Sequence, residues 1–398
     1  MINPTSNTTQ TKRILSLDGG GIRGCLSIGY LGQIEGIVRK QLNNDKAVLS
    51  DYFDLIGGTS TGALIATMLA MGKEVKDVRE TYKSVGANVF STPAHWAKNI
   101  PIIGSIRDMI FTKWSVEPLE KEIKKITSEE MLLGSDELKT GLCIVTKRAD
   151  TMSTWPYINH PNGKYKSNLK IPLWKILRAS SAAPTFFLPI KIDVGTKDAP
   201  SDGVFVDGGV SMANNPALQL FMVATLQGFP YRWQTGEDEL LVVSVGTGHW
   251  SRKLVHKQLL NPWNGFWGKQ VPEMLMQDAS DQVEMMMQYL SDTATKRPID
   301  GEVGDLSQDV LTGTPSLTYL RYNVELETDE NFQSSQEQRN DKLAKRLGEL
   351  SEADLVRLRE MDDGHNTNEL LALGDYFAEE EVKAEHFPEF FSASEKRM

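Results

Sequence analysis

Short apolar runs alternate with amphipathic stretches along most of the chain. Residues 13–17 and 52–56 are apolar runs of strand length, and residues 25–41 between them carry apolar side chains at helical spacing. A strand, a crossover helix and a second strand make a βαβ unit, in which the strands are parallel and the crossover is right-handed. The pattern therefore predicts an α/β fold built on a mostly parallel sheet.

The same alternation continues and then changes character near the C-terminus. It predicts further helices over residues 63–71, 74–86, 115–133, 172–183, 216–227 and 271–290. It predicts further strands over residues 140–147, 155–158, 203–206, 240–245 and 317–326. We expect residues 1–11 to be disordered, residues 12–326 to form the main domain, and residues 327–398 to form an acidic helical extension.

One uncharged stretch, residues 55–72, is nearly long enough to cross a membrane. It is interrupted by the polar, turn-forming residues 57–62, and the apolar remainder, residues 63–71, is too short for a span. We therefore expect a buried core helix. The first ten residues lack the apolar run of a signal peptide, so a cytoplasmic protein is expected.

Composition narrows the class of protein. A hydrophobic content of 40% and a charged content of 24% are ordinary for a globular domain. The net charge of −10 argues against a nucleic-acid polymer as partner, and it provides no overall attraction to anionic lipid. Cys25 and Cys143 form neither a disulfide framework nor a zinc pattern, and we expect both to pack as small apolar residues.

The first candidate for chemistry is a serine in a glycine-flanked turn. Residues 57–62 read Gly-Gly-Thr-Ser-Thr-Gly and lie between an expected strand and an expected helix. In that context G-x-S-x-G is typical of a nucleophile elbow, with Ser60 as the nucleophile. Gly58 and Gly62 would allow chain segments to pass close to the serine, where a Cβ atom has no room.

A second candidate is the glycine loop Asp18-Gly-Gly-Gly-Ile-Arg-Gly24, which follows the first expected strand. Parallel strands place this loop and the serine turn at the same carboxyl edge of the sheet. Backbone N–H groups there could stabilise the oxyanion of acyl transfer. The loop also fits the dinucleotide fingerprint G-x-G-x-x-G, but the next strand does not end in the acidic residue which that reading requires. A simple tight turn remains an alternative.

A serine nucleophile needs a base, and Asp207 is a better candidate than any of the six histidines. His249 comes closest to the position of a triad histidine, but a surface role is its simpler interpretation. Asp207 follows an expected buried strand and precedes Gly208 and Gly209, so we expect it at the same carboxyl edge as Ser60. A partly desolvated carboxylate can accept the proton directly. The alternative is an aspartate that only closes a turn.

These motifs together resemble the patatin-like phospholipases. The resemblance rests on Asp18–Gly24, Gly58–Gly62 and Asp207–Gly209 in that order, together with Ala-Ser-Ser-Ala-Ala-Pro at residues 179–184, and it covers about residues 12–325. It implies a three-layer α/β/α fold and a Ser–Asp dyad acyl hydrolase that uses no histidine, metal or cofactor. The residue roles it implies are Ser60 as nucleophile, Asp207 as base, and an oxyanion hole lined by Gly19, Gly20 and Gly21 with Arg23 in support.

The implied activity is that of a phospholipase A, which releases ester-linked fatty acids from membrane phospholipids and works peripherally at the inner membrane. A lysophospholipase or a broad esterase on soluble esters is one alternative. A second is an anti-phage effector activated by a cyclic nucleotide, because the format is similar to soluble bacterial members of the family. An inactive scaffold is a third, although the presence of Ser60 and Asp207 counts against it.

Two further expectations concern partners. Residues 88–111 or 263–267, which are rich in large apolar side chains, are expected to contact the lipid surface; the alternative is that these residues belong to the core. Because the net charge cannot attract anionic membrane, apolar burial would have to supply this binding. A homo-oligomer is also compatible with the sequence.

Overall fold

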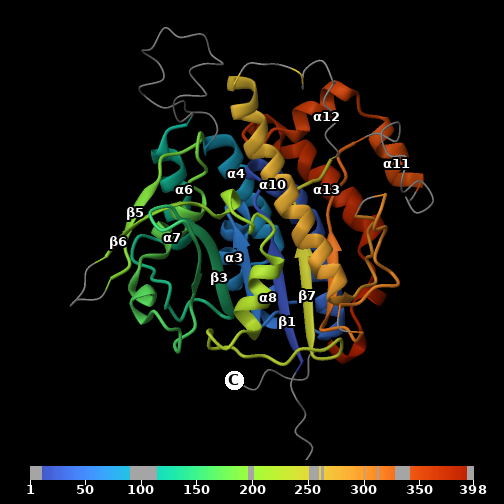
Figure 1. Cartoon of the computed structure of the whole chain (residues 1–398), viewed down its shortest axis with the longest axis horizontal. Helices are drawn as coiled ribbons and strands as arrows, with labels where there is room; N and C mark the ends of the chain where they lie inside the picture. The colour runs from blue at the N-terminus through green and yellow to red at the C-terminus, as the bar shows by residue number, and fades with distance from the viewer. Residues whose placement is uncertain are drawn as a thin grey trace, which may run out of the picture.

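The structure is a computed structural model that describes residues 11–89, 114–195, 201–250, 260, 264–299, 301–311, 313–327 and 341–391. Within these ranges nine strands form one sheet (Figure 1). The strands are β1 (Lys12–Leu17), β2 (Leu55–Thr59), β3 (Gly141–Arg148), β4 (Ser153–Ile158), β5 (Ile190–Asp193), β6 (Asp202–Asp207), β7 (Leu240–Val245), β8 (Ser291–Asp292) and β9 (Leu317–Tyr322). Their order is β5-β6-β3-β2-β1-β7-β9-β8, and β4 pairs with β3.

The sheet is mostly parallel, as expected. Neighbouring strands run parallel from β3 through β2, β1, β7 and β9 to β8, whereas β4, β5 and β6 pair in antiparallel fashion. The helices of the described residues are α1 (Gly24–Gln41), α2 (Leu49–Tyr52), α3 (Thr61–Ala70), α4 (Val75–Val89), α6 (Val116–Thr127), α7 (Leu173–Ser180), α8 (Ala217–Thr225), α10 (Asn264–Tyr289), α11 (Asp341–Gly348), α12 (Glu352–Arg359) and α13 (Thr367–Glu381).

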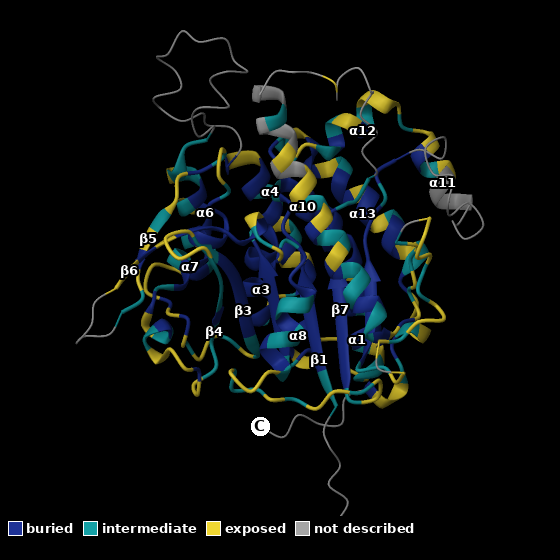
Figure 2. Cartoon of the chain, viewed as in Figure 1, coloured by how far each residue is buried: buried dark blue, intermediate teal, exposed yellow. Residues whose placement is uncertain are grey.

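Helices cover both faces of the sheet, which gives the expected three layers. Alternate residues of each strand point to opposite faces, so that Leu15 of β1 packs with α1, α3 and α13, while Ile14 packs with α8 and α10. Strands β2 and β7 are buried along their whole length, and β1 is buried at every residue after Lys12 (Figure 2). Continuous apolar strands of this kind are typical of parallel sheets covered on both sides. Cys25 and Cys143 are buried free thiols within these cores, as predicted.

The second strand lies three residues later than its apolar pattern suggests. Tyr52 ends helix α2, and β2 begins at Leu55 and continues through Gly57, Gly58 and Thr59. The Asp51 carboxylate accepts a hydrogen bond from the Val48 N–H at 2.9 Å and so caps α2 at its start. The small residues of β2 then pair with β1 on one side and with β3 on the other. As a result, the turn between strand and helix is reduced to Ser60 alone.

Two further elements are of the predicted type but end earlier than predicted. Helix α6 ends at Thr127 rather than near residue 133, and β9 ends at Tyr322 rather than at residue 326. Helix α3 is buried at every residue, as expected of a core helix. In the described part of the chain, no helix combines the length and apolarity that a membrane span requires.

Strands β2 and β6 meet end to end along one edge of β3. Strand β4 pairs with residues 143–148 of β3, and this pairing occupies one edge of that strand. On the other edge, β2 pairs with residues 141–145 and the antiparallel β6 with residues 146–148. Thr59 is therefore opposite Val145, and Asp207 is opposite the next residue along. This register brings the end of β6 to the end of β2.

The C-terminal extension packs against the main domain along α1. Helices α1 and α13 approach so closely that a Cβ atom on Gly29 would lie 2.2 Å from the carbonyl carbon of Gly374. Apolar residues of α12 and α13 belong to the same core as strands β1 and β7. The Arg13 guanidinium also donates to the carbonyl of Phe391 at 3.1 Å. The described part of the extension therefore shares the core of the main domain.

Some expectations fall outside the described residues. These are the disorder of residues 1–10 and lipid contact by residues 90–111 and by residue 263. Of the two expected lipid-contacting stretches, Asn88 and Val89 lie at the end of α4, and residues 264–267 lie at the start of α10.

Candidate active site

Ser60 occupies a strained turn at the end of β2. Its backbone has φ 54° and ψ −120°, a conformation that residues other than glycine rarely adopt and that costs on the order of 1–3 kcal/mol. The Ser60 N–H donates to the hydroxyl of Ser180 at 2.9 Å, and that hydroxyl donates to the Val145 carbonyl of β3 at 2.7 Å. The end of α7 therefore ties the serine turn to the sheet.

The two flanking glycines are required by close packing. A Cβ atom on Gly58 would lie 2.3 Å from the carbonyl carbon of Gly62, and a Cβ atom on Gly62 would lie 2.2 Å from the carbonyl oxygen of Leu17. Helix α3 can therefore start directly against the end of β1. This contact brings Ser60 beside the glycine loop. A Cβ atom on Gly19 would lie only 3.3 Å from the Ser60 Cβ.

Asp207 lies next to Ser60 and is only 3% exposed. Its carboxylate accepts a hydrogen bond from the Gly209 N–H at 2.7 Å. Burial raises the pKa of Asp207 to about 7, although the neighbouring Ser60 hydroxyl and the Gly209 N–H act to lower it. Asp207 follows a strand whose last three residues are buried, and that strand, β6, is antiparallel and runs toward the end of β2.

The described histidines make their contacts elsewhere. His249 Nε2 lies 3.5 Å from an Asp281 oxygen, and His386 Nδ1 lies 3.0 Å from the Tyr322 hydroxyl. His160 packs its ring against Tyr231. The His249 side chain is partly exposed, as a residue of the protein surface would be. His95 and His256 lie outside the described residues.

The glycine loop is held by a hydrogen bond at almost every residue. The Asp18 N–H donates to the Val245 carbonyl at 3.1 Å, the Gly19 N–H to the Asn214 carbonyl at 3.0 Å, and the Ile22 N–H to the Met361 carbonyl at 2.8 Å. In the described part of the chain, the Gly20 and Gly21 N–H groups have no acceptor, whereas the Gly19 N–H already has one.

The neighbours of Gly20 and Gly21 leave no room for side chains. A Cβ atom on Gly20 would lie 2.2 Å from the Thr247 hydroxyl, and one on Gly21 would lie 2.1 Å from the Met361 carbonyl oxygen. Gly21 also has φ +59°, which favours glycine. Arg23 is 7% exposed; its Nε is 3.5 Å from the Gly20 carbonyl, and its guanidinium packs over the Trp250 ring. Arg23 thus contacts the glycine loop at the Gly20 carbonyl and links it to Trp250.

Several supporting residues escaped the sequence analysis. The stretch of residues 179–184 was singled out by resemblance without a role, yet Ser180 holds the Ser60 N–H and the Ala182 carbonyl accepts from the Asp207 N–H at 3.0 Å. The Thr247 hydroxyl donates to the Gly19 carbonyl at 2.8 Å. The only sequence signal for Thr247 is its place directly after β7, between Gly246 and Gly248.

Comparison with known proteins agrees with this geometry. The model of the family "Patatin-like phospholipase" matches residues 15–221, a span that contains the serine turn, the glycine loop and Asp207. The chain belongs to the patatin-like phospholipase family.

Curated relatives within the family carry different descriptions. A cGAMP-activated phospholipase of Vibrio cholerae is 31% identical over 208 residues, which are 52% of this chain and 56% of that protein. A second cGAMP-activated phospholipase, from Escherichia coli, is 27% identical over 239 residues, 59% of this chain and 62% of that protein. A probable inactive patatin-like protein of Arabidopsis thaliana is 27% identical over 293 residues, 71% and 72% of the two chains. The chain thus aligns with less than two thirds of the length of the two bacterial relatives.

In this patatin-like chain, the Ser60 turn lies beside a buried carboxylate and against Gly19 of the glycine loop, whose next two N–H groups have no acceptor among the described residues. Such an arrangement suits acyl transfer, which needs a nucleophile, a base and donors for a developing oxyanion. Among the described residues no group of three or more His, Cys, Asp or Glu side chains is placed to hold a metal ion.

Proposed function

We propose that this protein is a lipid acyl hydrolase of the phospholipase A type, with Ser60 and Asp207 as its catalytic dyad. The observation that carries the proposal is the position of a buried carboxylate, with a pKa raised to about 7, at the end of β6 beside the Ser60 turn. A carboxylate with a pKa near neutrality is a far better base than an exposed aspartate. Membership of the patatin-like phospholipase family supports the lipid ester as substrate.

In the first half-reaction, Ser60 Oγ attacks the ester carbonyl carbon and transfers its proton to the Asp207 carboxylate. The carbonyl oxygen becomes an oxyanion, which the N–H groups of Gly20 and Gly21 stabilise. When the tetrahedral intermediate collapses, the ester C–O bond breaks and Asp207 returns the proton to the leaving alcohol. The products are a lysophospholipid and a fatty acyl ester of Ser60.

In the second half-reaction, water attacks the acyl carbon and gives a proton to Asp207. The bond from the acyl carbon to Ser60 Oγ then breaks, and Asp207 reprotonates the serine oxygen as the fatty acid leaves. The strained backbone of Ser60 and its bond to Ser180 fix the nucleophile throughout both steps.

A cyclic nucleotide is proposed as an activator, because two relatives are described as cGAMP-activated phospholipases. In that case the protein would act in anti-phage defence and associate peripherally with the membrane. A lysophospholipase or an esterase for soluble esters is the competing proposal, since the dyad itself would serve any of these esters.

One assay separates these proposals. The protein is incubated with diacyl phospholipid vesicles, with a lysophospholipid and with a short-chain soluble ester, each with and without cGAMP, and released fatty acid is measured. The proposal expects release from vesicles and its increase with cGAMP. Hydrolysis of the soluble ester alone would favour the esterase, and identical rates with and without cGAMP would remove the nucleotide from the proposal.

The dyad is tested by Ser60→Ala, Asp207→Ala and the double variant on the soluble ester. Each single change should remove activity, and the double should cost little more, because the two residues act as a unit. His249→Ala, combined with His256→Ala, is the control and should keep most of the rate. Full activity in either dyad variant, or loss in the folded histidine variant, would contradict the assignment.

A further inference from the structure

Asp18, the first residue of the glycine loop, is held by a buried arginine that lies 303 positions later in the sequence. Arg321 lies in β9, outside the span that the family model matches, and is 4% exposed. It donates to both oxygens of the Asp18 carboxylate, at 3.0 Å from Nη1 and at 2.7 Å from Nη2. A two-point contact of this kind fixes both the position and the orientation of the carboxylate.

A fixed Asp18 carboxylate also fixes the position of the glycine loop that follows it. The three residues that follow are glycines, which have no side chain to pack and which lose the most backbone freedom on ordering. Before Ile22, the Asp18 carboxylate is therefore the only side chain by which the loop can be held. It adds to the backbone bonds from Asp18 to Val245 and from Gly19 to Asn214.

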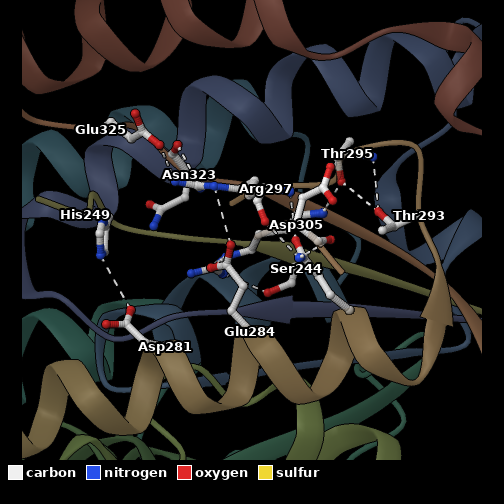
Figure 3. Close-up of polar contacts among 12 residues, drawn as sticks. Ser244, His249, Asp281, Glu284, Thr293, Thr295, Arg297, Asp305, Asn323 and Glu325 are labelled. Carbon is white, nitrogen blue, oxygen red and sulfur yellow. Dashed lines mark hydrogen bonds and ion pairs between the residues drawn. The ribbon is translucent and has the colours of Figure 1, made fainter. Parts of the chain in front are cut away.

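Arg321 is itself positioned by helix α10. Its Nε donates to the Glu284 carboxylate at 3.2 Å, and its Nη1 also donates to the Ser244 hydroxyl at 2.8 Å. Glu284 extends from α10 toward Arg297, whose Nε lies 3.4 Å from it and whose Nη2 donates to Glu325 (Figure 3). Guanidinium and carboxylate groups thus alternate in a chain from the glycine loop to α10.

The charged groups of this network are paired with one another inside the protein. Two guanidinium groups face three carboxylates, those of Asp18, Glu284 and Glu325. The two arginines lower the pKa of Glu284 despite its burial. Removing one partner from such a set leaves a buried charge uncompensated, which is costly. The arrangement therefore resists displacement of Asp18 relative to α10.

We propose that Arg321 is a positioning residue for the glycine loop and that Glu284 of α10 holds the Arg321 side chain in place. Through Asp18, the pair sets where the Gly20 and Gly21 N–H groups lie relative to Ser60. This rests on the proposed function, since it assigns the loop to the oxyanion. Displacing α10 would misplace the donors without touching Ser60 or Asp207.

The test compares Arg321→Lys with Arg13→Lys. Arg13 is a matched control, because it is 1% exposed, pairs with Asp54 at 3.3 Å and lies at the opposite end of β1 from the loop. Lysine keeps the charge but cannot make the two-point contact. We expect Arg321→Lys to lower kcat on the soluble ester about 10- to 100-fold with little change in KM, because oxyanion donors act in the transition state. Arg13→Lys should leave kcat unchanged.

A second pair of measurements covers the case in which one variant folds poorly. Glu284→Gln keeps the side-chain volume and should lower kcat in the same direction by a smaller factor. Hydrogen exchange of the amides of residues 18–24 should become faster in Arg321→Lys and Glu284→Gln but not in Arg13→Lys. Equal thermal destabilisation of all variants, with kcat and loop exchange unchanged, would overturn the proposal.

If the proposed function itself is wrong, the experiment gives a different result. In that case wild-type protein would hydrolyse no ester and a fluorophosphonate would not label Ser60, whereas the exchange measurement would still report whether Arg321 holds the loop. Slower ester hydrolysis together with faster loop exchange, in a protein that retains Ser60 labelling, supports the positioning role.

Discussion

Asp207 shows at the scale of one residue how the fold can make a base. Its carboxyl group is almost completely buried and has the Ser60 hydroxyl and the Gly209 N–H as partners. Two neutral donors do not repay the loss of hydration of a full charge, so the pKa of Asp207 rises to about 7. The sequence could indicate Asp207 as a candidate, but burial of this degree follows only from the packing of β6 against β3.

The raised pKa predicts a defined pH dependence of activity. The base must be ionised, so kcat/KM for a neutral soluble ester should fall about tenfold per pH unit below about pH 7 and level off above it. The measurement is a pH profile of kcat/KM at constant ionic strength. A profile that stays level from pH 5 to 8 would show that Asp207 is not the base.

The same shift predicts that Asp207→Asn is more stable than wild type at high pH. The folded pKa of about 7 lies above an unfolded value of about 4, so folding is favoured below pH 4 and stability is lost as pH rises toward 7. Asparagine does not titrate, and its advantage should grow over this range to on the order of 2–4 kcal/mol at pH 8. Urea unfolding of both proteins at pH 5 and pH 8 measures it. An equal difference at both values would contradict the shift.

At the scale of elements, the site forms where three chain segments end together. Strand β2 ends at Thr59, and antiparallel β6 ends at Asp207 on the same edge of β3. Helix α7 ends at Ser180, whose hydroxyl bonds to the Ser60 N–H and to the Val145 carbonyl. Apolar periodicity predicted that these elements exist. It could not predict that β6 is antiparallel or that β2 starts at Leu55, because direction and register depend on partners distant in the sequence.

Ser180 offers a test of this meeting point. Ser180→Ala removes the acceptor of the Ser60 N–H and the donor to the Val145 carbonyl, and leaves both groups without that partner in a buried region. We expect a loss of about 1–3 kcal/mol of stability and a decrease in kcat of about tenfold, because the nucleophile is less well placed.

The control is Asn159→Ala at the opposite end of β3. Asn159 also bridges two backbone groups, the Leu142 N–H at 2.8 Å and the Thr140 carbonyl at 3.1 Å. Its loss should cost a comparable amount of stability and leave kcat unchanged. Equal effects of the two variants on kcat, measured on protein shown to be folded by circular dichroism, would remove Ser180 from a positioning role.

At the scale of the whole molecule, the C-terminal extension contributes to the site as well as to the core. The Met361 carbonyl accepts from the Ile22 N–H and lies against Gly21, and the Asp362 carboxylate accepts from the Trp114 indole at 2.8 Å. The sequence predicted helices there and a boundary near residue 327. These contacts could not be predicted, since they join residues more than two hundred positions apart and leave no local pattern.

The contact between α1 and α13 determines the position of this extension. A substitution that adds a single methyl group at the contact tests this role. Gly29→Ala places a Cβ atom 2.2 Å from the Gly374 backbone, so the helices must separate. We expect a loss of about 1–3 kcal/mol from overpacking together with a lower kcat, because Met361 moves away from the glycine loop. Gly32→Ala on the same helix has nothing within 4 Å and should be neutral or stabilising by about 0.5–1 kcal/mol. Urea midpoints and ester hydrolysis of the two variants are compared. If Gly29→Ala lost stability but kept full kcat, the extension would support the fold without positioning the loop.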